Sequence, residues 1–597
     1  MSIRLPRIRL TRRRVISAAT VLTVLAGLIG WAAWPAARRH TVQDAQLTVR
    51  SGPSGTEPVS LDTTFYLPTT ASPAHPVPAI LLAHGFGGTK LTVADDARSF
   101  ADRGYAVLTW TARGFGRSGG EIHLDSPEYE VRDAQRLLDW LAARPDIVRD
   151  AAGDPRVGAV GGSYGGALAL LLAGLDPRVD AIIPMITWND LSRAFLPEST
   201  GRPPLDGVFK RQWAGLFFGS GGTSADLAGV DGLTDPRLGV SLPAGDPACG
   251  RFAPDVCAAY LSVATTGRAT PAVVDLLRRS SPATVLDRIK APTLLIQGQA
   301  DSLFPISEAE ANFRGIAAAG TPVRVDWFAG GHDGGSGPRS DVDRLRYLSI
   351  RWLDYYLRGQ GDPPGTGFTY SRITGFDTDT RRITTSGFAT DTYPGLVGDT
   401  TPRPVTVAGP VQPVANPPDG TPAALTSLPG AGGSLASFLN AAAVELPGQH
   451  ADFWSPPLPT SIDVVGAPSV RIRAASPTGE AVLFVKLYDA DPHGAASLPF
   501  GLAAPVRLTG LPARIDQATP VTVTLPAIVY RFEAGHRLRL TVSTSDQAYS
   551  TPVAPTHYTV RHDATTTPVR LPQGTRTPNA PPQVLLRYGR AAQGGLG

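Results

Sequence analysis

The sequence predicts a doubly wound, mostly parallel α/β domain with an inserted helical cap, followed by a β-sandwich and preceded by a membrane anchor or export signal. Three observations predict this architecture. Short apolar runs alternate with helical patterns over residues 41–375, as in a parallel sheet covered by helices. The alternation stops at residues 187–290, where an insertion is expected to form the cap. Beyond residue 448, apolar residues recur at every second position, which is typical of strands.

Residues 1–40 carry the features of a membrane anchor or an export signal. Residues 15–37 form an uncharged stretch of 23 residues, long enough to cross a bilayer. Six arginines precede it and two follow it, so we expect the N-terminus in the cytoplasm and the rest of the chain outside. Residues 11–16 also resemble a twin-arginine export signal. No A-x-A cleavage site lies near the end of the stretch, which favours a retained anchor; a cleaved signal and a secreted protein are the alternative.

The charge balance argues against a nucleic-acid partner. The first 40 residues hold eight of the 55 Lys and Arg residues and none of the 51 Asp and Glu residues, so the rest of the chain is slightly acidic. It therefore implies no basic face for binding phosphates.

The α/β part begins with strand-like runs in residues 41–75, which we assign to an antiparallel start of the sheet. Apolar runs then predict strands, and an amphipathic or apolar pattern predicts two helices between them. The predicted strands cover residues 79–83, 105–110, 157–160, 179–186, 292–297 and 323–328, and the helices cover residues 131–141 and 167–174.

A glycine-rich motif at residues 161–166, GGSYGG, joins one of these strands to a helix. Strand, sharp turn and helix are the context of a nucleophile elbow, in which a serine hydroxyl stands beside a helix N-terminus. The motif predicts an α/β hydrolase with Ser163 as the nucleophile. The alternative is a glycine-rich turn with a chance serine, and a second G-x-S-x-G match around Ser118 has no helix directly behind it.

A serine nucleophile needs a base and a carboxylate that orients the base. In α/β hydrolases these follow in the order Ser, Asp or Glu, His, each after a later strand. Asp301 follows the strand at residues 292–297, and His332 follows the strand at residues 323–328. Order and spacing predict the triad Ser163–Asp301–His332. Asp326 and Asp333 are the alternative carboxylates, but one lies within a strand and the other is adjacent to the base.

The oxyanion hole is expected from two backbone amides. One belongs to Tyr164, directly after the nucleophile, and the other to Phe86, in the loop after the strand at residues 79–83. A phosphate-binding loop is the other interpretation of residues 84–90. It fails because Thr89 precedes Lys90, where that motif has glycine. The chain shows no metal-ligand cluster, so we expect no metal and no cofactor.

The predicted cap contains six aromatic residues that could line an acyl pocket or form the core of the cap: Trp188, Phe195, Phe209, Trp213, Phe217 and Phe218. It also holds the two cysteines of the chain, Cys249 and Cys257. These can pair in an oxidising compartment, and two buried free thiols are the alternative.

The C-terminal part is expected to consist of a linker with irregular strands at residues 376–447 and a β-sandwich at residues 448–590. In residues 537–542 and 470–473 apolar and polar side chains alternate, and turns rich in Pro and Gly separate such runs.

These motifs resemble the serine hydrolase family that contains Xaa-Pro dipeptidyl peptidases, cocaine esterase (CocE/NonD) and α-amino acid ester hydrolases. The elbow at residues 161–166 fits the family's G-x-S-Y-x-G form, and residues 113–120 fit its R-G-x-G-x-S-x-G loop. Residues 351–359 resemble its last catalytic-domain helix. The resemblance implies a jelly roll for the C-terminal sandwich, and it places the family's Ser, Asp and His on Ser163, Asp301 and His332. Three C-terminal segments match as well, at residues 454–458, 487–494 and 535–540.

One departure from the family bears on the substrate. Several relatives use a tyrosine hydroxyl in the first oxyanion loop, where this chain has Phe86. The resemblance then implies an oxyanion hole that is built from backbone amides.

We therefore expect an exported serine hydrolase that forms an acyl-enzyme. The resemblance implies dipeptide release after proline, with hydrolysis of carboxylic esters, as in cocaine esterase, as the alternative. The partners would be a small peptide or ester substrate and the membrane. A dipeptidyl peptidase must also bind a free ammonium, for which Asp190, Glu198 and Asp206 are the candidates. A third alternative is a non-catalytic protein, or one that binds carbohydrate through the β-sandwich.

Overall fold

The computed structural model describes residues 39–202, 206–222, 249–379, 382–397, 402–427, 443–562 and 569–571. The anchor or signal predicted for residues 1–40 lies outside these ranges, apart from its last two residues. In the part of the chain that the structure describes, no helix has both the length and the apolar character needed to cross a membrane.

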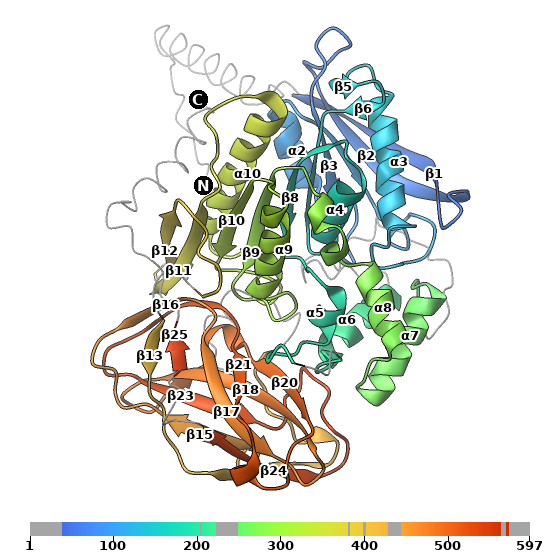
Figure 1. Ribbon diagram of the computed structural model, residues 1–597. Helices are drawn as coiled ribbons and strands as arrows, with labels where there is room; N and C mark the ends of the chain where they lie inside the picture. The colour runs from blue at the N-terminus through green and yellow to red at the C-terminus, as the bar shows by residue number, and fades with distance from the viewer. Residues whose placement is uncertain are drawn as a thin grey trace, which may run out of the picture.

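A ten-stranded sheet forms the centre of the first domain (Figure 1). Across the sheet the strands are β1 (His40–Ser51), β2 (Glu57–Pro68), β4 (Ala106–Trp110), β3 (Ala79–Ala83), β7 (Val157–Gly162), β8 (Val179–Met185), β9 (Thr293–Gly298), β10 (Val323–Phe328), β11 (Phe368–Asp377) and β12 (Arg382–Thr390). Every pair from β4 to β11 is parallel. The pair β1 and β2 is antiparallel, which confirms the predicted start of the sheet.

Helices cover both faces of this sheet, because successive side chains of a buried strand point to opposite faces. Ile80 and Leu82 of β3 pack with α2 (Ala94–Asp102) and α10 (Arg339–Arg358). Leu81, between them, faces α3 (Glu130–Ala142), α4 (Tyr164–Leu175) and α9 (Ile306–Ala318). The α/β hydrolase fold predicted from the alternation of strands and helices is therefore confirmed. A small hairpin, β5 (Arg149–Ala151) with β6 (Asp154–Pro155), precedes β7.

The chain between β8 and β9 forms a helical cap, as predicted. The described residues of the cap form the α-helices α5 (Leu191–Phe195), α6 (Arg211–Gly222), α7 (Pro254–Thr266) and α8 (Pro271–Arg279). The short 3-10 helices η2 (Pro282–Thr284) and η3 (Leu286–Arg288) follow them. The helix boundaries have local causes. The Asp190 side chain accepts amide hydrogens at the start of α5, and Thr270 does so for α8. α7 ends at Gly267, whose φ of 66° is left-handed.

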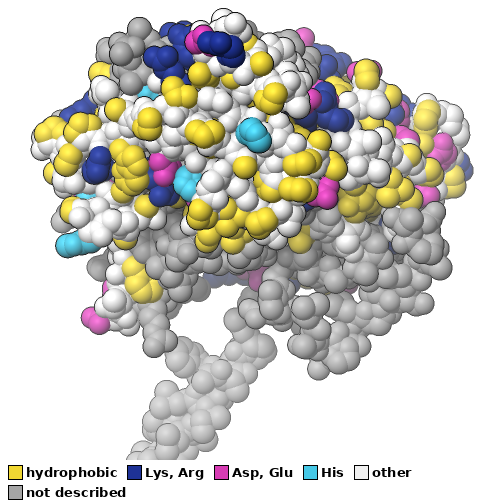
Figure 2. Space-filling view, turned by 90° about the horizontal axis from the view of Figure 1, so that it is seen from below, with side chains coloured by type: hydrophobic (Ala, Val, Ile, Leu, Met, Phe, Trp, Pro, Cys, Tyr) yellow, Lys and Arg dark blue, Asp and Glu magenta, His cyan; other side chains and the backbone are white. Residues whose placement is uncertain are grey.

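The C-terminal part is a β-rich domain with its own apolar core. One sheet contains β13 (Arg403–Val405), β25 (Val569–Leu571), β17 (Ser469–Ala475), β24 (Thr556–His562), β14 (Gln412–Asn416) and β21 (Val521–Thr524). The second contains β15 (His450–Trp454), β23 (Arg537–Ser543), β18 (Glu480–Ala490), β19 (Ala496–Ser497) and β20 (Ala504–Thr509), and β16 (Ile462–Gly466) pairs with β22 (Ile528–Phe532). Figure 2 views the molecule from the side of this domain, where acidic side chains lie among the basic ones.

The segment predicted as a linker is divided between the two domains. β11 and β12 extend the first sheet to Thr390, so the predicted boundary at residue 375 falls inside β11. β13 and β14 instead belong to the C-terminal domain. Sequence patterns did not reveal this division because it depends on which distant strand each segment pairs with. The domain boundaries themselves stay predictions.

The C-terminal domain contacts the cap directly (Figure 1). The guanidinium Nε of Arg507 donates to the Gly207 carbonyl oxygen at 2.8 Å, and the Ser550 amide donates to the Phe209 carbonyl oxygen at 2.9 Å. The C-terminal domain thereby holds the cap segment that leads into α6. The apolar part of this contact consists of Val208, Val482, Phe484, Ala548 and Tyr549.

Candidate active site

Ser163 lies at the apex of the turn between β7 and α4. Its φ of 54° and ψ of −117° are strained for a residue with a side chain. The turn has no room for further side chains, because a Cβ on Gly161 would lie 2.4 Å from the Gly165 carbonyl oxygen. A Cβ on Gly165 would lie 2.6 Å from the Ala83 carbonyl oxygen. The flanking glycines therefore allow the close packing that presents the serine at the N-terminus of α4.

The structure brings Ser163, His332 and Asp301 into one hydrogen-bonded row. Ser163 Oγ lies 2.9 Å from His332 Nε2, and His332 Nδ1 lies 2.7 Å from Asp301 Oδ2. Asp301 follows β9 and His332 follows β10, and these neighbouring parallel strands end at the same edge of the sheet. A carboxylate can only accept, so Nδ1 carries the proton and Nε2 is left to accept the serine hydroxyl.

The Asp301 carboxylate is buried and accepts four N–H groups. Oδ1 accepts the amides of Leu303 and Phe304 at 3.1 and 2.7 Å. Oδ2 accepts the His332 amide at 3.2 Å in addition to the ring Nδ1–H. Four donors on two oxygens hold the carboxylate in one orientation.

The two alternative carboxylates considered from the sequence have other partners. Asp326 binds Arg344, with Oδ2 and Nε 3.0 Å apart. Asp333 accepts the Ser302 amide, and burial raises the pKa of Asp333 to about 6. Ser302 Oγ in turn accepts the indole N–H of Trp213 at 3.0 Å, and the Trp213 ring stands edge-on to the imidazole, with centroids 5.9 Å apart. The cap helix α6 therefore contacts the loops that carry Asp301 and His332.

The loop after β3 lies beside the serine. A Cβ on Gly85 would be 3.6 Å from the Cβ of Ser163, so the backbone that leads into Phe86 approaches this serine closely. His84 holds this loop, because its Nε2 accepts the Ala112 amide at 2.9 Å and its Nδ1 donates to the Gly85 carbonyl oxygen at 2.6 Å. Burial lowers the pKa of His84 to about 4, so the ring is neutral at pH 7, as these two bonds require.

Tyr164, the other predicted oxyanion donor, is the first residue of α4, where amides have no acceptor within the helix. Its hydroxyl accepts the Asp125 amide at 3.0 Å and lies 3.4 Å from Glu130 Oε1. Glu130 also accepts two amides of the same loop, at 2.7 and 3.0 Å, and burial raises the pKa of Glu130 to about 7. This buried network fixes Tyr164 and places Leu124 at the wall of a pocket.

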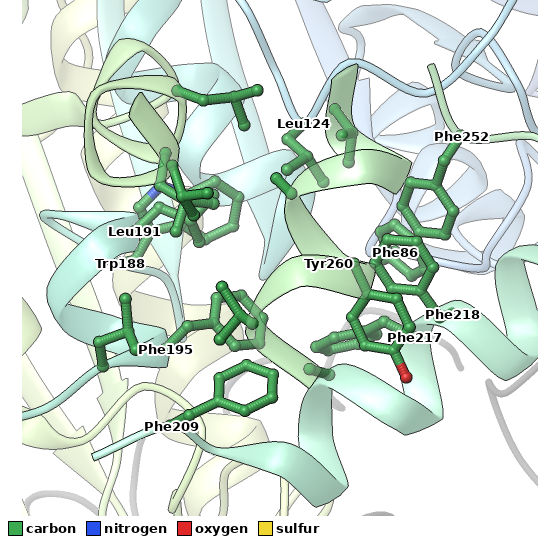
Figure 3. A pocket seen from close by; sticks show the side chains of 18 of the residues that line it. Phe86, Leu124, Trp188, Leu191, Phe195, Phe209, Phe217, Phe218, Phe252 and Tyr260 are labelled. Atoms are coloured by element: carbon green, nitrogen blue, oxygen red, sulfur yellow. The ribbon is translucent and has the colours of Figure 1, made fainter. Parts of the chain in front are cut away.

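Ser163 lines that pocket together with apolar side chains. Figure 3 shows the aromatic side chains around it. Its volume is about 90 Å³, and no charged side chain among the described residues lines it. Phe86 packs edge-on against Phe217, with ring centroids 4.9 Å apart, so the loop after β3 and the cap form one wall of the pocket. Of the six aromatic residues predicted in the cap, Trp213 does not line the pocket but packs edge-on against the His332 imidazole. The five cap aromatics that line the pocket are Trp188, Phe195, Phe209, Phe217 and Phe218.

The three carboxylates considered for binding an ammonium do not line this pocket. Asp190 caps α5 through the Ser192 amide, Glu198 accepts the amide and hydroxyl of Thr200, and Asp206 pairs with Arg268 at 2.6 Å. Within the described ranges, no group of three or more His, Cys, Asp or Glu side chains could hold a metal ion.

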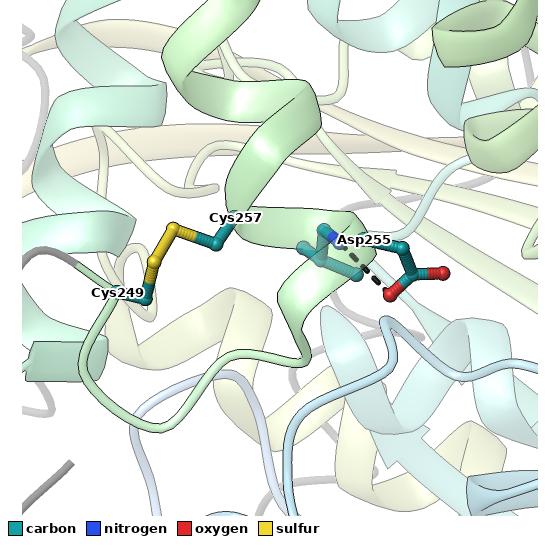
Figure 4. The surroundings of a disulfide bond; sticks show 4 residues. Cys249, Asp255 and Cys257 are labelled. Atoms are coloured by element: carbon teal, nitrogen blue, oxygen red, sulfur yellow. Dashed lines mark hydrogen bonds between the residues drawn. A yellow bond between two sulfur atoms is a disulfide. The ribbon is translucent and has the colours of Figure 1, made fainter. Parts of the chain in front are cut away.

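Cys249 and Cys257 are joined in a disulfide at the start of α7 (Figure 4). Their Cα atoms lie 5.4 Å apart. Asp255, in the first turn of this helix, accepts the Val256 amide at 2.9 Å. Val256 and Tyr260 of α7 line the pocket, so the crosslink anchors one of its walls.

Two residues that the sequence did not single out support this site. His84 holds the loop after β3 through its two hydrogen bonds. Lys210 is buried and directly precedes the first residue of α6 in the chain, and its ammonium donates to the Leu303 carbonyl oxygen at 2.7 Å. One signal was available for Lys210: it is one of only four lysines in the chain, and it follows the apolar pair Val208 and Phe209.

Comparison with known families agrees with this geometry. Residues 55–330 match the family described as X-Pro dipeptidyl-peptidase (S15 family). Residues 402–580 match the X-Pro dipeptidyl-peptidase C-terminal non-catalytic domain. The first match contains Ser163 and Asp301 and ends two residues before His332.

Solved structures share the fold over both domains. An α-amino acid ester hydrolase has a TM-score of 0.61 at 15% identity, covering 90% of this chain and 97% of that one. An aminopeptidase from a marine sediment archaeon (Thaumarchaeota archaeon) has a TM-score of 0.61 at 14% identity, covering 89% and 96%. A CocE/NonD family hydrolase from Staphylococcus aureus has a TM-score of 0.59 at 14% identity, covering 89% and 94%. At these identities the likeness shows the fold.

Known proteins match shorter stretches at higher identity. The bis(hydroxyethyl) terephthalate hydrolase of Streptomyces coelicolor is 29% identical over 126 residues, which are 21% of this chain and 37% of that protein. A cutinase of Thermobifida fusca is 27% identical over 189 residues, 30% of this chain and 56% of that one. The chain thus spans less than two thirds of each of these relatives. Because both of its parts match one family and its fold is that of the solved relatives, the chain belongs to the S15 X-Pro dipeptidyl-peptidase family of serine hydrolases.

Proposed function

We propose that this chain hydrolyses carboxylic esters with an apolar acyl group, through an acyl-enzyme on Ser163. In this proposal His332 is the general base, Asp301 orients the imidazole and stabilises its charge, and the amides of Phe86 and Tyr164 hold the oxyanion. The hydrogen-bonded row from Ser163 Oγ to the Asp301 carboxylate supports these roles.

The reaction then runs in two halves. Ser163 Oγ attacks the carbonyl carbon while His332 Nε2 takes the hydroxyl proton. The bond from the carbonyl carbon to the alcohol oxygen breaks, and the alcohol leaves with that proton. Water next attacks the acyl carbon and gives a proton to His332. The bond from the acyl carbon to Oγ breaks, the acid leaves, and Ser163 regains its proton.

The apolar pocket beside Ser163 carries the ester proposal. An ammonium placed among its aromatic side chains would be desolvated without a partner, which costs several kcal/mol. An uncharged acyl group gains about 0.8 kcal/mol for each CH₂ that it buries, so kcat/KM should rise about fourfold per CH₂. The pocket of about 90 Å³ is smaller than the ~150 Å³ cavity that holds benzene, so the gain should end at a short chain.

A series of p-nitrophenyl esters from acetate to octanoate tests this proposal. Wild-type kcat/KM should peak at a short acyl chain, and Phe217→Ala should move the peak to a longer one, because Phe217 lines the pocket. Phe100→Ala is the matched control, since Phe100 of α2 packs on Tyr105 and does not line the pocket, so the peak should stay unmoved. A kcat/KM that does not depend on chain length, or turnover that survives Ser163→Ala, would refute the proposal.

Dipeptide release after proline is a second candidate, favoured by the family descriptions that both matched segments carry. Assays of an Xaa-Pro anilide with a free and an acetylated N-terminus distinguish the two candidates. Cleavage of the free form alone would support the peptidase. Turnover of esters without either anilide would rule it out.

We also propose that the chain is exported, with residues 1–40 as its anchor or signal. The uncharged stretch and its arginines support export, and so does the disulfide between Cys249 and Cys257, which suits an oxidising compartment. A reporter fused after residue 60 should be exported, and replacing Arg12 and Arg13 by Lys should block this only if the twin-arginine route is used. A cytosolic reporter would contradict export.

A further inference from the structure

Lys210 is a buried cation that the two-step chemistry does not use. The residue is 3% exposed, and its ammonium donates to the Leu303 carbonyl oxygen at 2.7 Å. Among the described residues, no carboxylate oxygen lies within the 4.0 Å of an ion pair to this ammonium. A buried charge without a close partner is costly, so its retention at this place points to a role in the site.

Three carboxylates surround Lys210 at longer range. They are Asp301, Asp333 and Glu308, the last in the first turn of α9. Burial lowers the pKa of Lys210 to about 8 against the attraction of these carboxylates, so the ammonium is still charged at pH 7. Burial raises the pKa of Glu308 to about 7. Asp190 and Arg193 of the cap line the same polar cavity as Lys210 and are the other charged groups facing it from α5.

Lys210 contacts the loop after Asp301 at the point that orients the carboxylate. The Leu303 amide donates to Asp301 Oδ1, and the carbonyl of the same residue accepts from Lys210. Trp213, in the first turn of α6, donates to the neighbouring Ser302. The start of α6 therefore holds this loop from outside the triad.

The C-terminal domain holds the start of α6 in turn. The Gln212 amide donates to the Ala548 carbonyl oxygen at 3.3 Å, and the Arg211 Nε donates to the Gln547 carbonyl oxygen at 3.2 Å. The C-terminal domain therefore binds Arg211 and Gln212. Their neighbours in the chain, Lys210 and Trp213, bind the loop after Asp301.

We propose that Lys210 is a positioning residue for the acid–base pair, whose buried charge holds the loop after Asp301 and opposes protonation of His332. This inference rests on the proposed function. A fixed positive charge disfavours the imidazolium, whereas the surrounding carboxylates favour it, and this balance sets the pH above which His332 can accept the serine proton. Lys210 thereby extends the range in which the base is neutral toward lower pH.

The pH dependence of kcat/KM on p-nitrophenyl butyrate tests the proposal. In Lys210→Met the acid limb should move to higher pH by roughly 0.5–1.5 units, the effect of one charge at intermediate dielectric. Lys210→Gln keeps a donor for the Leu303 carbonyl but lacks the charge, so its limb should move equally while its plateau kcat falls less. Lys210→Arg keeps the charge and should stay near the wild-type limb.

Lys486→Met is the matched control. Lys486 is a buried lysine in β18, paired with Glu445 at 2.7 Å in the C-terminal domain, so its loss should leave the acid limb in place. A folded Lys210→Met or Lys210→Gln protein with an unmoved limb overturns the proposal, provided that Ser163→Ala is inactive. If Ser163→Ala keeps its turnover, the proposed function itself fails, which is a different result. Thermal unfolding of each variant establishes which proteins are folded.

Discussion

Replacing Asp301 by Asn is the most direct test of how the site positions its base. The carboxylate accepts four N–H groups, two on each oxygen. An asparagine side chain offers one accepting oxygen, and its NH₂ group would face two of these donors. If the NH₂ faces His332, the ring must expose an unprotonated Nδ1 and carry its proton on Nε2, where it cannot accept from Ser163.

The expected loss follows from that tautomer. A wrong tautomer lowers kcat by about 10⁴, which corresponds to about 5 kcal/mol of transition-state stabilisation. If the NH₂ instead faces Leu303 and Phe304, two amides that now bind the carboxylate lose their acceptor, and each loss costs about 1–3 kcal/mol of stability. We therefore expect a large loss of kcat together with a lowered melting temperature.

Steady-state hydrolysis of p-nitrophenyl butyrate at pH 8, with thermal unfolding of each protein, measures both effects. Asp333→Asn is the matched control, because Asp333 is a neighbouring buried carboxylate whose hydrogen bond goes to the Ser302 amide. An asparagine at residue 333 keeps an oxygen that can accept the Ser302 amide, so kcat should fall less than about tenfold. A folded Asp301→Asn protein with more than a hundredth of the wild-type kcat would refute the reasoning.

Three further predictions concern the nucleophile, the oxyanion loop and the disulfide. Ser163→Ala should lower kcat by several orders of magnitude. Ser118→Ala should keep most activity, because the Ser118 hydroxyl is buried and donates to a backbone carbonyl. Equal losses of kcat in the two variants would contradict this prediction. His84 has a pKa of about 4 in the folded protein, below its ordinary value of 6.5, so the unfolded chain binds the proton more readily. The free energy of unfolding should therefore fall by about 3 kcal/mol as the pH drops from 6.5 to 4. Thermal unfolding over this range should show a flatter dependence for His84→Gln, and identical slopes would exclude the assignment. Cys249→Ser removes a crosslink between residues eight apart, which should lower the free energy of unfolding by about 2–3 kcal/mol. It should also raise KM for butyrate esters, because α7 lines the pocket. An unchanged KM would show that the disulfide does not support the pocket.

The architecture of the first domain was predictable because its signals are local. Each buried strand is a short apolar run, and the elbow needs glycine at fixed offsets from Ser163, where a Cβ would meet backbone atoms. The order of Asp301 and His332 was also visible, since each follows a parallel strand and such strands end at one edge of the sheet. The structure brings these three residues together, and their catalytic roles stay predictions.

Pairing between distant segments could not be predicted from the sequence. The irregular stretch after residue 359 divides between two sheets, because β11 pairs with β10 while β13 pairs with β25 near the end of the chain. A period-two pattern shows that a segment is a strand but does not identify its partner.

By itself, the sequence determined the fold class, the nucleophile turn and the two residues expected to act with Ser163, because these follow from periodicity, glycine spacing and the order of strands. Only the tertiary structure decided what surrounds them. The pocket is apolar because Phe86 of one loop packs against Phe217 and Phe252 of the cap, while Asp190 and Asp206 of the cap have other partners. Lys210 reaches Leu303 across 93 positions of the chain. Such contacts depend on how separate elements pack, and no local pattern encodes them.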